Sequence, residues 1–248
     1  MVKNVILTGG SKGIGKEIAK KLLKDGYNVY ICARNETDLK NTANELSTFG
    51  DINYFVLDVS KREDIAEFCD GWNNPLYGIV NNAGVCQSER LLEDGGVWDS
   101  VIKTNLEGVY FLTKGLIKNI KNNGRIVNIS SQLGRDGRTG YGAYCASKFG
   151  VIGLTKCWAK ELGIKGITVN AICPGWVKTE MAINDLKRMA KEKNISAEDL
   201  YEEICRPLEL KRFTEPSEVA NLVSFLMSDD AGGITGRDWL LSTVWNQE

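Results

Sequence analysis

Histidine is absent from the 248-residue chain. Catalytic systems in which a histidine activates a serine or cysteine nucleophile are therefore excluded, and so are metal sites built on imidazole ligands. Acid–base chemistry near neutral pH must instead use Tyr, Lys, Cys, Asp or Glu side chains with shifted pKa values. We predict no metal site.

Long apolar runs and paired cysteines are also missing. No run of roughly 18 apolar residues occurs, so we expect no membrane span. The N-terminus enters an apolar strand pattern at once, without the regions of a signal peptide. The seven cysteines are scattered, odd in number and never in C-x-x-C spacing, which suits free thiols in a reducing compartment. These features predict a cytoplasmic protein.

Neither sign of charge predominates, since 31 Lys and Arg residues stand against 32 Asp and Glu residues. Nucleic-acid binding usually shows as a basic excess or stripe, so we expect none. No Pro- or Ser-rich linker, internal repeat or low-complexity tract divides the chain. Its length suits one sizeable α/β domain over residues 1–248.

Short β-branched runs alternate with longer helical patterns. The expected strands are Val5–Thr8, Asn28–Cys32, Asn53–Leu57, Gly78–Asn81, Arg125–Ser130 and Thr168–Cys173, with Leu240–Val244 as a candidate last strand. The expected helices are Ile14–Lys24, Glu36–Ser47, Arg62–Trp72, Trp98–Lys121, Tyr141–Leu162 and Ser217–Met227. This alternation predicts a doubly wound, Rossmann-type α/β fold, with about seven mostly parallel strands and helices on both faces.

One segment, from Thr179 to Arg212, interrupts the alternation. It contains two helical patterns, roughly Glu180–Lys193 and Ala197–Cys205, and follows an expected strand. Because α/β sheets bind ligands at the carboxyl ends of their strands, we predict a mobile helical lid over about 179–212 rather than a second domain.

A glycine-rich turn, TGGSKGIG at positions 8–15, stands between the first expected strand and the first helix. Such a turn lets the backbone approach a pyrophosphate, whose charge then lies at the helix N-terminus. The spacing differs from that of ATP-binding loops, so we predict a dinucleotide site.

The second expected strand ends in Cys32-Ala33-Arg34-Asn35, where NAD-binding proteins usually have an acidic residue. An Arg suits the 2′-phosphate of NADP because its guanidinium matches phosphate geometry. Lys12 adds a second positive charge within the turn. NADP(H) is therefore favoured over NAD(H).

Tyr144 and Lys148 are spaced i and i+4 on one expected helix, so they share a face. A lysine cation favours the phenolate and lowers the pKa of a nearby tyrosine. Ser131 follows an expected strand at the sheet edge near this helix, where it would either stabilise developing oxyanion charge or serve as a turn or cap hydroxyl. Asn105 falls inside an expected helix, where Asn has poor propensity, so it is either a tolerated surface residue or part of a kink or polar site.

Taken together, these motifs resemble those of the short-chain dehydrogenase/reductase family over essentially the full chain. The matching residues are TGGSKGIG at 8–15, Asp58, Val59, Asn81, Asn82, Ala83, Gly84, Asn105, Ser131, Tyr144, Lys148, Pro174 and Gly175. One departure is the C-terminal sequence Leu240–Trp245, where the family often has a Val-Asp-Gly-Gly-like run.

The resemblance implies a catalytic role for four residues. Tyr144 would be the general acid in reduction and the base in oxidation. Ser131 would orient the substrate carbonyl. Lys148 would hold the nicotinamide ribose and lower the Tyr144 pKa. Asn105 would hold a water that links Lys148 to solvent.

The resemblance also implies a set of cofactor-binding residues running from the adenine to the nicotinamide. These are Gly9, Ser11, Lys12, Gly13, Ile14, Gly15, Arg34, Asp58, Val59, Asn82, Ala83, Gly84, Tyr144, Lys148, Pro174, Gly175, Val177 and Thr179. Long helices such as Trp98–Lys121 and Tyr141–Leu162 resemble those that form dimers in the family, so a homodimer or homotetramer is expected.

The function that follows is NADPH-dependent reduction of a small ketone to a secondary alcohol. Similarity to 3-oxoacyl-thioester reductases, polyketide ketoreductases and hydroxybutyrate dehydrogenases leaves the substrate open, and thioester-linked ketones are among the candidates. Three arginines, Arg90, Arg135 and Arg138, lie in loops expected around the substrate. The alternatives are an NAD-dependent secondary-alcohol or hydroxybutyrate-type dehydrogenase and a non-catalytic cofactor-binding scaffold.

Overall fold

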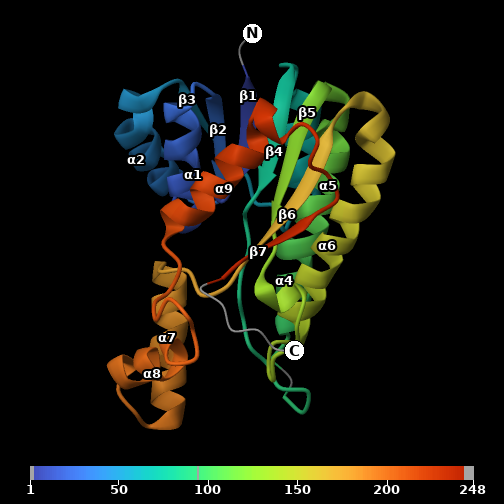
Figure 1. Cartoon of the computed structure of the whole chain (residues 1–248). Coiled ribbons are helices and arrows are strands. Elements are labelled where there is room, and N and C mark those ends of the chain that lie inside the picture. The colour runs from blue at the N-terminus through green and yellow to red at the C-terminus, as the bar shows by residue number, and fades with distance from the viewer. Residues whose placement is uncertain (1–2, 94, 243–248) are drawn as a thin grey trace.

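A seven-stranded parallel sheet forms the centre of the protein in a computed structural model, which describes residues 3–93 and 95–242 (Figure 1). The strand order is β3-β2-β1-β4-β5-β6-β7. The strands are β1 (Asn4–Thr8), β2 (Asn28–Ala33), β3 (Ile52–Val56), β4 (Leu76–Asn81), β5 (Ile120–Ile129), β6 (Thr168–Pro174) and β7 (Asp238–Leu241). The predicted doubly wound fold is confirmed, and every strand pair is parallel.

Helices cover both faces of the sheet (Figure 1). One face is covered by α1 (Gly13–Lys24), α2 (Glu36–Leu46) and α9 (Pro216–Met227), and the other by α3 (Arg62–Gly71), α5 (Gly108–Leu116) and α6 (Gly142–Leu162). Strands at the centre of the sheet, such as β1, β4 and β6, are buried on both faces because helices cover both. On β1, for example, Val5 and Leu7 pack on the α1 side and Ile6 packs on the α3 side.

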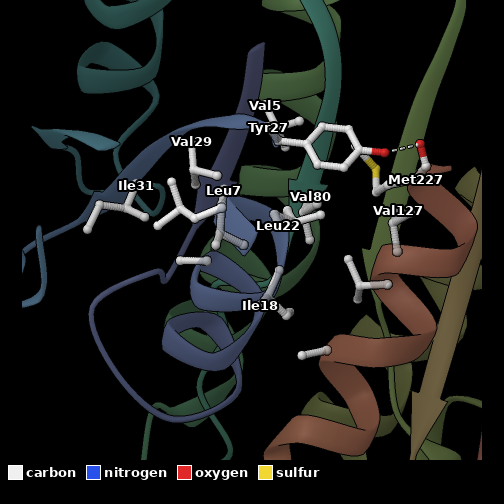
Figure 2. Close-up of a cluster of buried hydrophobic side chains, with 14 of the residues drawn as sticks. Val5, Leu7, Ile18, Leu22, Tyr27, Val29, Ile31, Val80, Val127 and Met227 are labelled. Atoms are coloured by element: carbon white, nitrogen blue, oxygen red, sulfur yellow. Dashed lines mark hydrogen bonds between the residues drawn. The ribbon is translucent and has the colours of Figure 1, made fainter. Parts of the chain in front are cut away.

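The apolar core beneath α1 and α9 is formed by side chains from both the first and the last third of the chain (Figure 2). Ile18 and Leu22 of α1 are fully buried against the sheet. The buried Tyr27 hydroxyl donates a hydrogen bond of 2.9 Å to the Met227 carbonyl at the end of α9. This contact satisfies the polar end of an otherwise apolar side chain.

The strand order reverses between β1 and β4, which are neighbours at the centre of the sheet. The chain leaving β1 therefore turns to one face and the chain leaving β4 to the other. A crevice opens between two such loops at the carboxyl edge of the sheet. The glycine-rich turn follows β1 and Asn82 follows β4, so the fold brings these two motifs to the same point.

The predicted continuous helix over Trp98–Lys121 is wrong. The segment divides into α4 (Val97–Ile102), a π-helical turn at Lys103–Glu107, and α5, and β5 has begun by Ile120. The π-helical turn coincides with Asn105, whose side chain hydrogen-bonds the backbone of Val85. A side chain that bonds a neighbouring loop competes with regular helix geometry, and apolar spacing does not reveal this competition.

The strand predicted at Arg125–Ser130 is β5 (Ile120–Ile129), which starts earlier than predicted and ends one residue earlier. Its pairing with β4 shifts between Leu76 and Gly78, which face Ile120 and Arg125 respectively. Asn123 within the intervening residues has φ 63°, a conformation that Asn tolerates better than most residues.

The two helices predicted between Thr179 and Arg212 are present, as α7 (Glu180–Lys193) and α8 (Ala197–Cys205). They lie beyond the carboxyl ends of the strands (Figure 1). Their contact is a separate apolar cluster that includes Leu186, Leu200 and Phe213, and Trp176 stacks on Phe213 at 5.1 Å. The mobility of this segment stays a prediction.

At the C-terminal end of the described chain, the last strand begins at Asp238 instead of Leu240 and pairs with β6. The rest of the predicted Leu240–Val244 strand, from residue 243, lies outside the described residues. Within the described residues, no helix has the length and apolar character needed to span a membrane.

Candidate active site

A cleft of about 600 Å³ opens at the carboxyl edge of the sheet, where the crevice between β1 and β4 was located. It is lined by every residue that the sequence assigned to cofactor binding. Ser131, Tyr144 and Lys148 also line it, whereas Asn105 does not. Segments more than 100 residues apart in the chain thus meet at one site.

The glycine-rich turn is fixed to the loop that follows β4. Asn82 donates through Nδ2 to the carbonyls of Thr8 (2.9 Å) and Gly9 (3.1 Å), and the Thr8 hydroxyl accepts from the backbone N–H of Asn82. Gly9 has φ 66°, and a Cβ on Gly15 would overlap the Gly9 carbonyl oxygen. Both positions therefore require glycine.

The N-terminus of α1 faces the cleft without a partner of its own. Its N-cap residue, Lys12, makes no side-chain capping bond, and the first turn has no acidic residue. Ser11 to Gly15 line the cleft, so the uncapped N–H groups at the start of this helix are available to an anion. These residues fit the diphosphate of a nicotinamide dinucleotide.

At the outer end of the cleft, Lys12 and Arg34 are exposed, and neither forms an ion pair with the part of the chain described here. Asp58 is turned toward Ser60, which donates to it from both N–H (3.0 Å) and Oγ (2.7 Å). Burial alone would raise the pKa of Asp58. The hydrogen bonds from Ser60 and the nearby Arg34 outweigh this effect and hold the pKa below its usual value. Asp38, which sequence reasoning missed, also lines the cleft here.

The inner end of the cleft carries Ser131, Tyr144 and Lys148. Ser131 begins the turn after β5, and its Oγ accepts a hydrogen bond of 3.1 Å from the Leu133 N–H. The two roles considered for Ser131 are therefore compatible, because a hydroxyl that accepts from the backbone keeps its own proton to donate. Lys148 Nζ donates to the Ile129 carbonyl at 2.9 Å and lies 5.7 Å from the centre of the Tyr144 ring.

The pKa values of this pair are shifted in opposite directions by the same cause. Burial raises the pKa of the Tyr144 phenol, and the Cys86 thiol adds to the rise, while hydrogen bonding with Ser131 acts against it. Burial lowers the pKa of Lys148 to about 8. Desolvation thus favours the neutral form of both groups. The lowering of the Tyr144 pKa that the sequence predicted stays a prediction for the complex with the cofactor.

Replacing Lys148 by methionine is expected to change how stability depends on pH. The folded-state pKa of about 8 lies below the ordinary value of 10.5, so the cost of burying the charge is fully present below pH 8 and is relieved as pH rises toward 10.5. The free energy of unfolding of the wild type, relative to Lys148→Met, should rise by about 3 kcal/mol between pH 7 and pH 10.

Urea unfolding at both pH values measures this difference. Lys160→Met is the matched control, because Lys160 is an exposed residue of the same helix. The control should differ from the wild type by a constant amount. A constant difference for Lys148→Met as well would show that Lys148 keeps an ordinary pKa.

Asn105 lies behind the cleft and is fully buried. Its Oδ1 accepts from the Val85 N–H at 2.8 Å, and its Nδ2 donates to the Val85 carbonyl at 2.9 Å. A methyl group built on Gly84 would lie 3.3 Å from Asn105 Oδ1 and 3.5 Å from Lys148 Nζ. One position beside Gly84 therefore lies within contact distance of both the amide and the ammonium.

The substrate end of the cleft includes residues that the sequence did not single out, namely Cys86, Leu133, Tyr141, Asn184 and Asp185. Asp185 of α7 accepts a hydrogen bond of 2.9 Å from the Tyr141 hydroxyl, just before α6. The spacing of Tyr141, one helical turn before Tyr144, was a signal that could have identified it. Of the three arginines expected around the substrate, Arg138 lines the cleft, whereas Arg90 and Arg135 do not; Trp176 and Met181 line it as well.

The model of the short chain dehydrogenase family matches residues 3–190 of the chain. The chain therefore belongs to the short-chain dehydrogenase/reductase family, as its motifs predicted. It is an oxidoreductase of the ketoreductase type that acts on CH–OH or C=O groups with a nicotinamide cofactor.

Individual relatives are similar along nearly the whole chain. A diacetyl reductase forming (S)-acetoin, from Staphylococcus epidermidis, is 38% identical over 250 residues, covering 97% of each chain. A 3-oxoacyl-acyl-carrier-protein reductase from the same organism is 34% identical over 245 residues, covering 96% of each. The crystal structure of an actinorhodin polyketide ketoreductase variant with NADPH superimposes with a TM-score of 0.92 at 34% identity, covering 98% of this chain and 96% of that one.

Proposed function

We propose that the protein reduces a small ketone to a secondary alcohol with NADPH, and that Tyr144 is the proton donor. The observation that carries this proposal is the composition of one cleft. Ser131, Tyr144 and Lys148 lie at its inner end, and Lys12 and Arg34, which form no ion pair within the described residues, lie at its outer end. The uncapped start of α1, at Lys12, lines the same cleft.

Each inner residue has a distinct part in the reaction. The reduced nicotinamide supplies the hydride. Ser131 donates a hydrogen bond to the substrate carbonyl oxygen and so stabilises the negative charge that develops there. Tyr144 donates its phenolic proton to the same oxygen. Lys148 uses one of its three donors on Ile129, would hold the nicotinamide ribose with a second, and favours the transient phenolate.

The space between Asn105 and Lys148 gives the returning proton a route. A water in that space would accept from Lys148 and donate to Asn105 Oδ1, which is the role the sequence assigned to Asn105. We propose that Tyr144 is reprotonated by this path. The roles of Ser131, Tyr144, Lys148 and Asn105 all belong to this proposal.

Gly84→Ala tests the path directly. The added methyl group would lie 3.3 Å from Asn105 Oδ1, a tight contact that requires a shift of a few tenths of an ångström, and it would take the place that a water would need. We expect kcat to fall by about tenfold or more, within the range that positioned proton transfer contributes, with a smaller effect on the melting temperature. Steady-state kinetics and thermal unfolding measure the two effects.

A matched control for Gly84→Ala is Gly153→Ala on α6, where a methyl group would meet nothing within 4 Å. This control should keep the wild-type kcat. An unchanged kcat in Gly84→Ala would contradict the path through this space, while leaving Tyr144 as proton donor.

NADPH is proposed over NADH because Lys12 and Arg34 present two cations where the 2′-phosphate of the ribose would lie. A second candidate, an NAD-dependent secondary-alcohol or hydroxybutyrate-type dehydrogenase, is favoured by one observation. Asp38 lines the same end of the cleft, and a carboxylate there can accept from a ribose 2′-hydroxyl.

The test of the function is turnover by the purified protein. Consumption of NADPH and of NADH would be followed with a panel of small ketones, including a thioester-linked 3-oxoacyl compound. Faster reduction with NADPH supports the proposal, and faster oxidation of alcohols with NAD⁺ supports the second candidate. Cofactor binding without turnover of any ketone would favour the scaffold interpretation. The homo-oligomer and the cytoplasmic location stay predictions.

A further inference from the structure

Of the three arginines expected near the substrate, only Arg138 lines the cleft. Arg135, three residues earlier, pairs with Asp238 of β7 at 3.3 Å. Arg90 lies outside the lining as well. The substrate end therefore contains one of these three cations, in the segment that leads into α6.

Aromatic rings hold Arg138 in place. Its guanidinium carbon lies 4.9 Å from the ring centre of Tyr141 and 5.5 Å from that of Trp176. One guanidinium nitrogen also approaches the Met189 sulfur at 3.6 Å. Contacts of a guanidinium with aromatic faces stabilise its charge but leave most of its in-plane N–H donors unused.

No carboxylate among residues 3–93 and 95–242 forms an ion pair with Arg138. Asp185, which like Arg138 contacts Tyr141, is engaged elsewhere. It pairs with Arg188 at 2.6 Å and accepts from the Tyr141 hydroxyl at 2.9 Å. The charge of Asp185 is thus balanced by another cation, and Arg138 keeps its binding capacity toward the cleft.

Arg138 is also close to the reacting groups. It contacts the ring of Tyr141, which precedes Tyr144 by one helical turn. Tyr141 is the N-cap residue of α6, and Tyr144 lies in the first turn of that helix. The Cys86 thiol, which lines the cleft, experiences the positive charges of both Lys148 and Arg138. A substrate group bound by Arg138 would therefore lie only a short distance from the carbonyl that Tyr144 protonates.

We propose that Arg138 is a specificity-determining residue that binds a carboxylate of the substrate, so that the ketone is part of a small keto acid. This inference rests on the proposed function, because it assumes that the carbonyl lies at Tyr144. The phosphate of a pantetheine arm is also an anion that a guanidinium binds. The closeness of Arg138 to Tyr144 favours the carboxylate, since the pantetheine arm separates its phosphate from the thioester by a long chain.

The experiment compares acids with their neutral esters. Acetoacetate and levulinate, with their methyl esters, would be titrated calorimetrically into the protein saturated with oxidised cofactor, which cannot reduce them. Turnover of the same compounds with reduced cofactor would be measured in parallel, together with a phosphopantetheine thioester of acetoacetate. The variants are Arg138→Met, Arg138→Lys and, as the matched control, Arg135→Met.

The wild type is expected to bind at least one acid about 10- to 100-fold more tightly than its ester, as a charge-assisted hydrogen bond provides. Arg138→Met should lose this preference through weaker acid binding and a higher KM for the acid, with a smaller effect on the ester. Arg138→Lys should keep part of the preference for the acid over its ester, and Arg135→Met should keep this preference in full.

Equal binding of acid and ester by the wild type, or an unchanged preference in Arg138→Met, would overturn the inference. The inference would also be overturned if Arg138 affected only the binding and turnover of the phosphopantetheine thioester. Binding and turnover separate the two proposals. Acid binding that depends on Arg138, without reduction of any ketone, would refute the proposed function and leave the assignment of Arg138 standing.

Discussion

Tyr144→Phe should reduce kcat by about 10²- to 10⁴-fold, the contribution expected of a positioned general acid. The substitution removes one oxygen atom from a side chain that hydrogen-bonds with Ser131 and whose ring centre lies 5.7 Å from Lys148 Nζ. The phenyl ring keeps the apolar contacts, so the cofactor should bind with nearly unchanged affinity. At neutral pH the phenol is uncharged in both the folded and the unfolded protein, because burial only raises its pKa, so its removal should cost no more than the hydrogen bond with Ser131, about 1 kcal/mol.

The measurements are kcat for reduction of a ketone, cofactor affinity by fluorescence titration, and thermal unfolding. Tyr110→Phe is the matched control, because Tyr110 lies on α5 against Phe111 and Trp158 and does not line the cleft. Full activity is expected from this control. A Tyr144→Phe enzyme that keeps more than about a tenth of the wild-type kcat would contradict the assignment of Tyr144 as proton donor.

Removing both cations at the outer end of the cleft should abolish the preference for NADPH. Lys12 and Arg34 are exposed and unpaired within the described chain, so each is available to the 2′-phosphate. In Lys12→Gln/Arg34→Gln, we expect the ratio of kcat/KM for NADPH to that for NADH to fall by about 100-fold, the combined effect of two charge-assisted contacts to phosphate. NADH, which lacks this phosphate, should be used about as well as before.

Lys40→Gln/Lys61→Gln is the control for this variant. It removes the same two charges from exposed positions outside the lining of the cleft. The control should keep the wild-type ratio, which would exclude a general effect of net charge. If the Lys12→Gln/Arg34→Gln protein lost activity with both cofactors equally, the cations would serve the shared diphosphate and the preference for NADPH would need another cause.

The sequence predicted the order and type of the main elements because parallel strands and their crossover helices have distinct periodicities. Both helices between Thr179 and Arg212 were predicted with correct bounds. The error at Trp98–Lys121 has a different origin. The interruption depends on hydrogen bonds from Asn105 to the loop at Val85, about 20 residues away, and local spacing carries no information on such a contact.

The cofactor cleft was easier to predict than the substrate end for a similar reason. Its residues occur in short motifs that follow individual strands, so the fold class alone brings them together. The contact between Arg138 and Trp176, and that between Tyr141 and Asp185, join segments that share no motif. Their meeting depends on how α7 lies over the sheet edge. The choice among Arg90, Arg135 and Arg138 therefore needed the structure.

The α7–α8 segment has an apolar core of its own, in which Leu186 and Leu200 pack on Phe213 instead of on the sheet. Mutations in the α7–α8 segment that change the substrate end can therefore accumulate without destabilising the part of the fold that would bind the dinucleotide. Such separation of a variable part from a constant one allows a single architecture to acquire new substrates over evolutionary time. Residues of α7 that face the cleft, such as Met181, are accordingly the first positions to vary when altered specificity is sought.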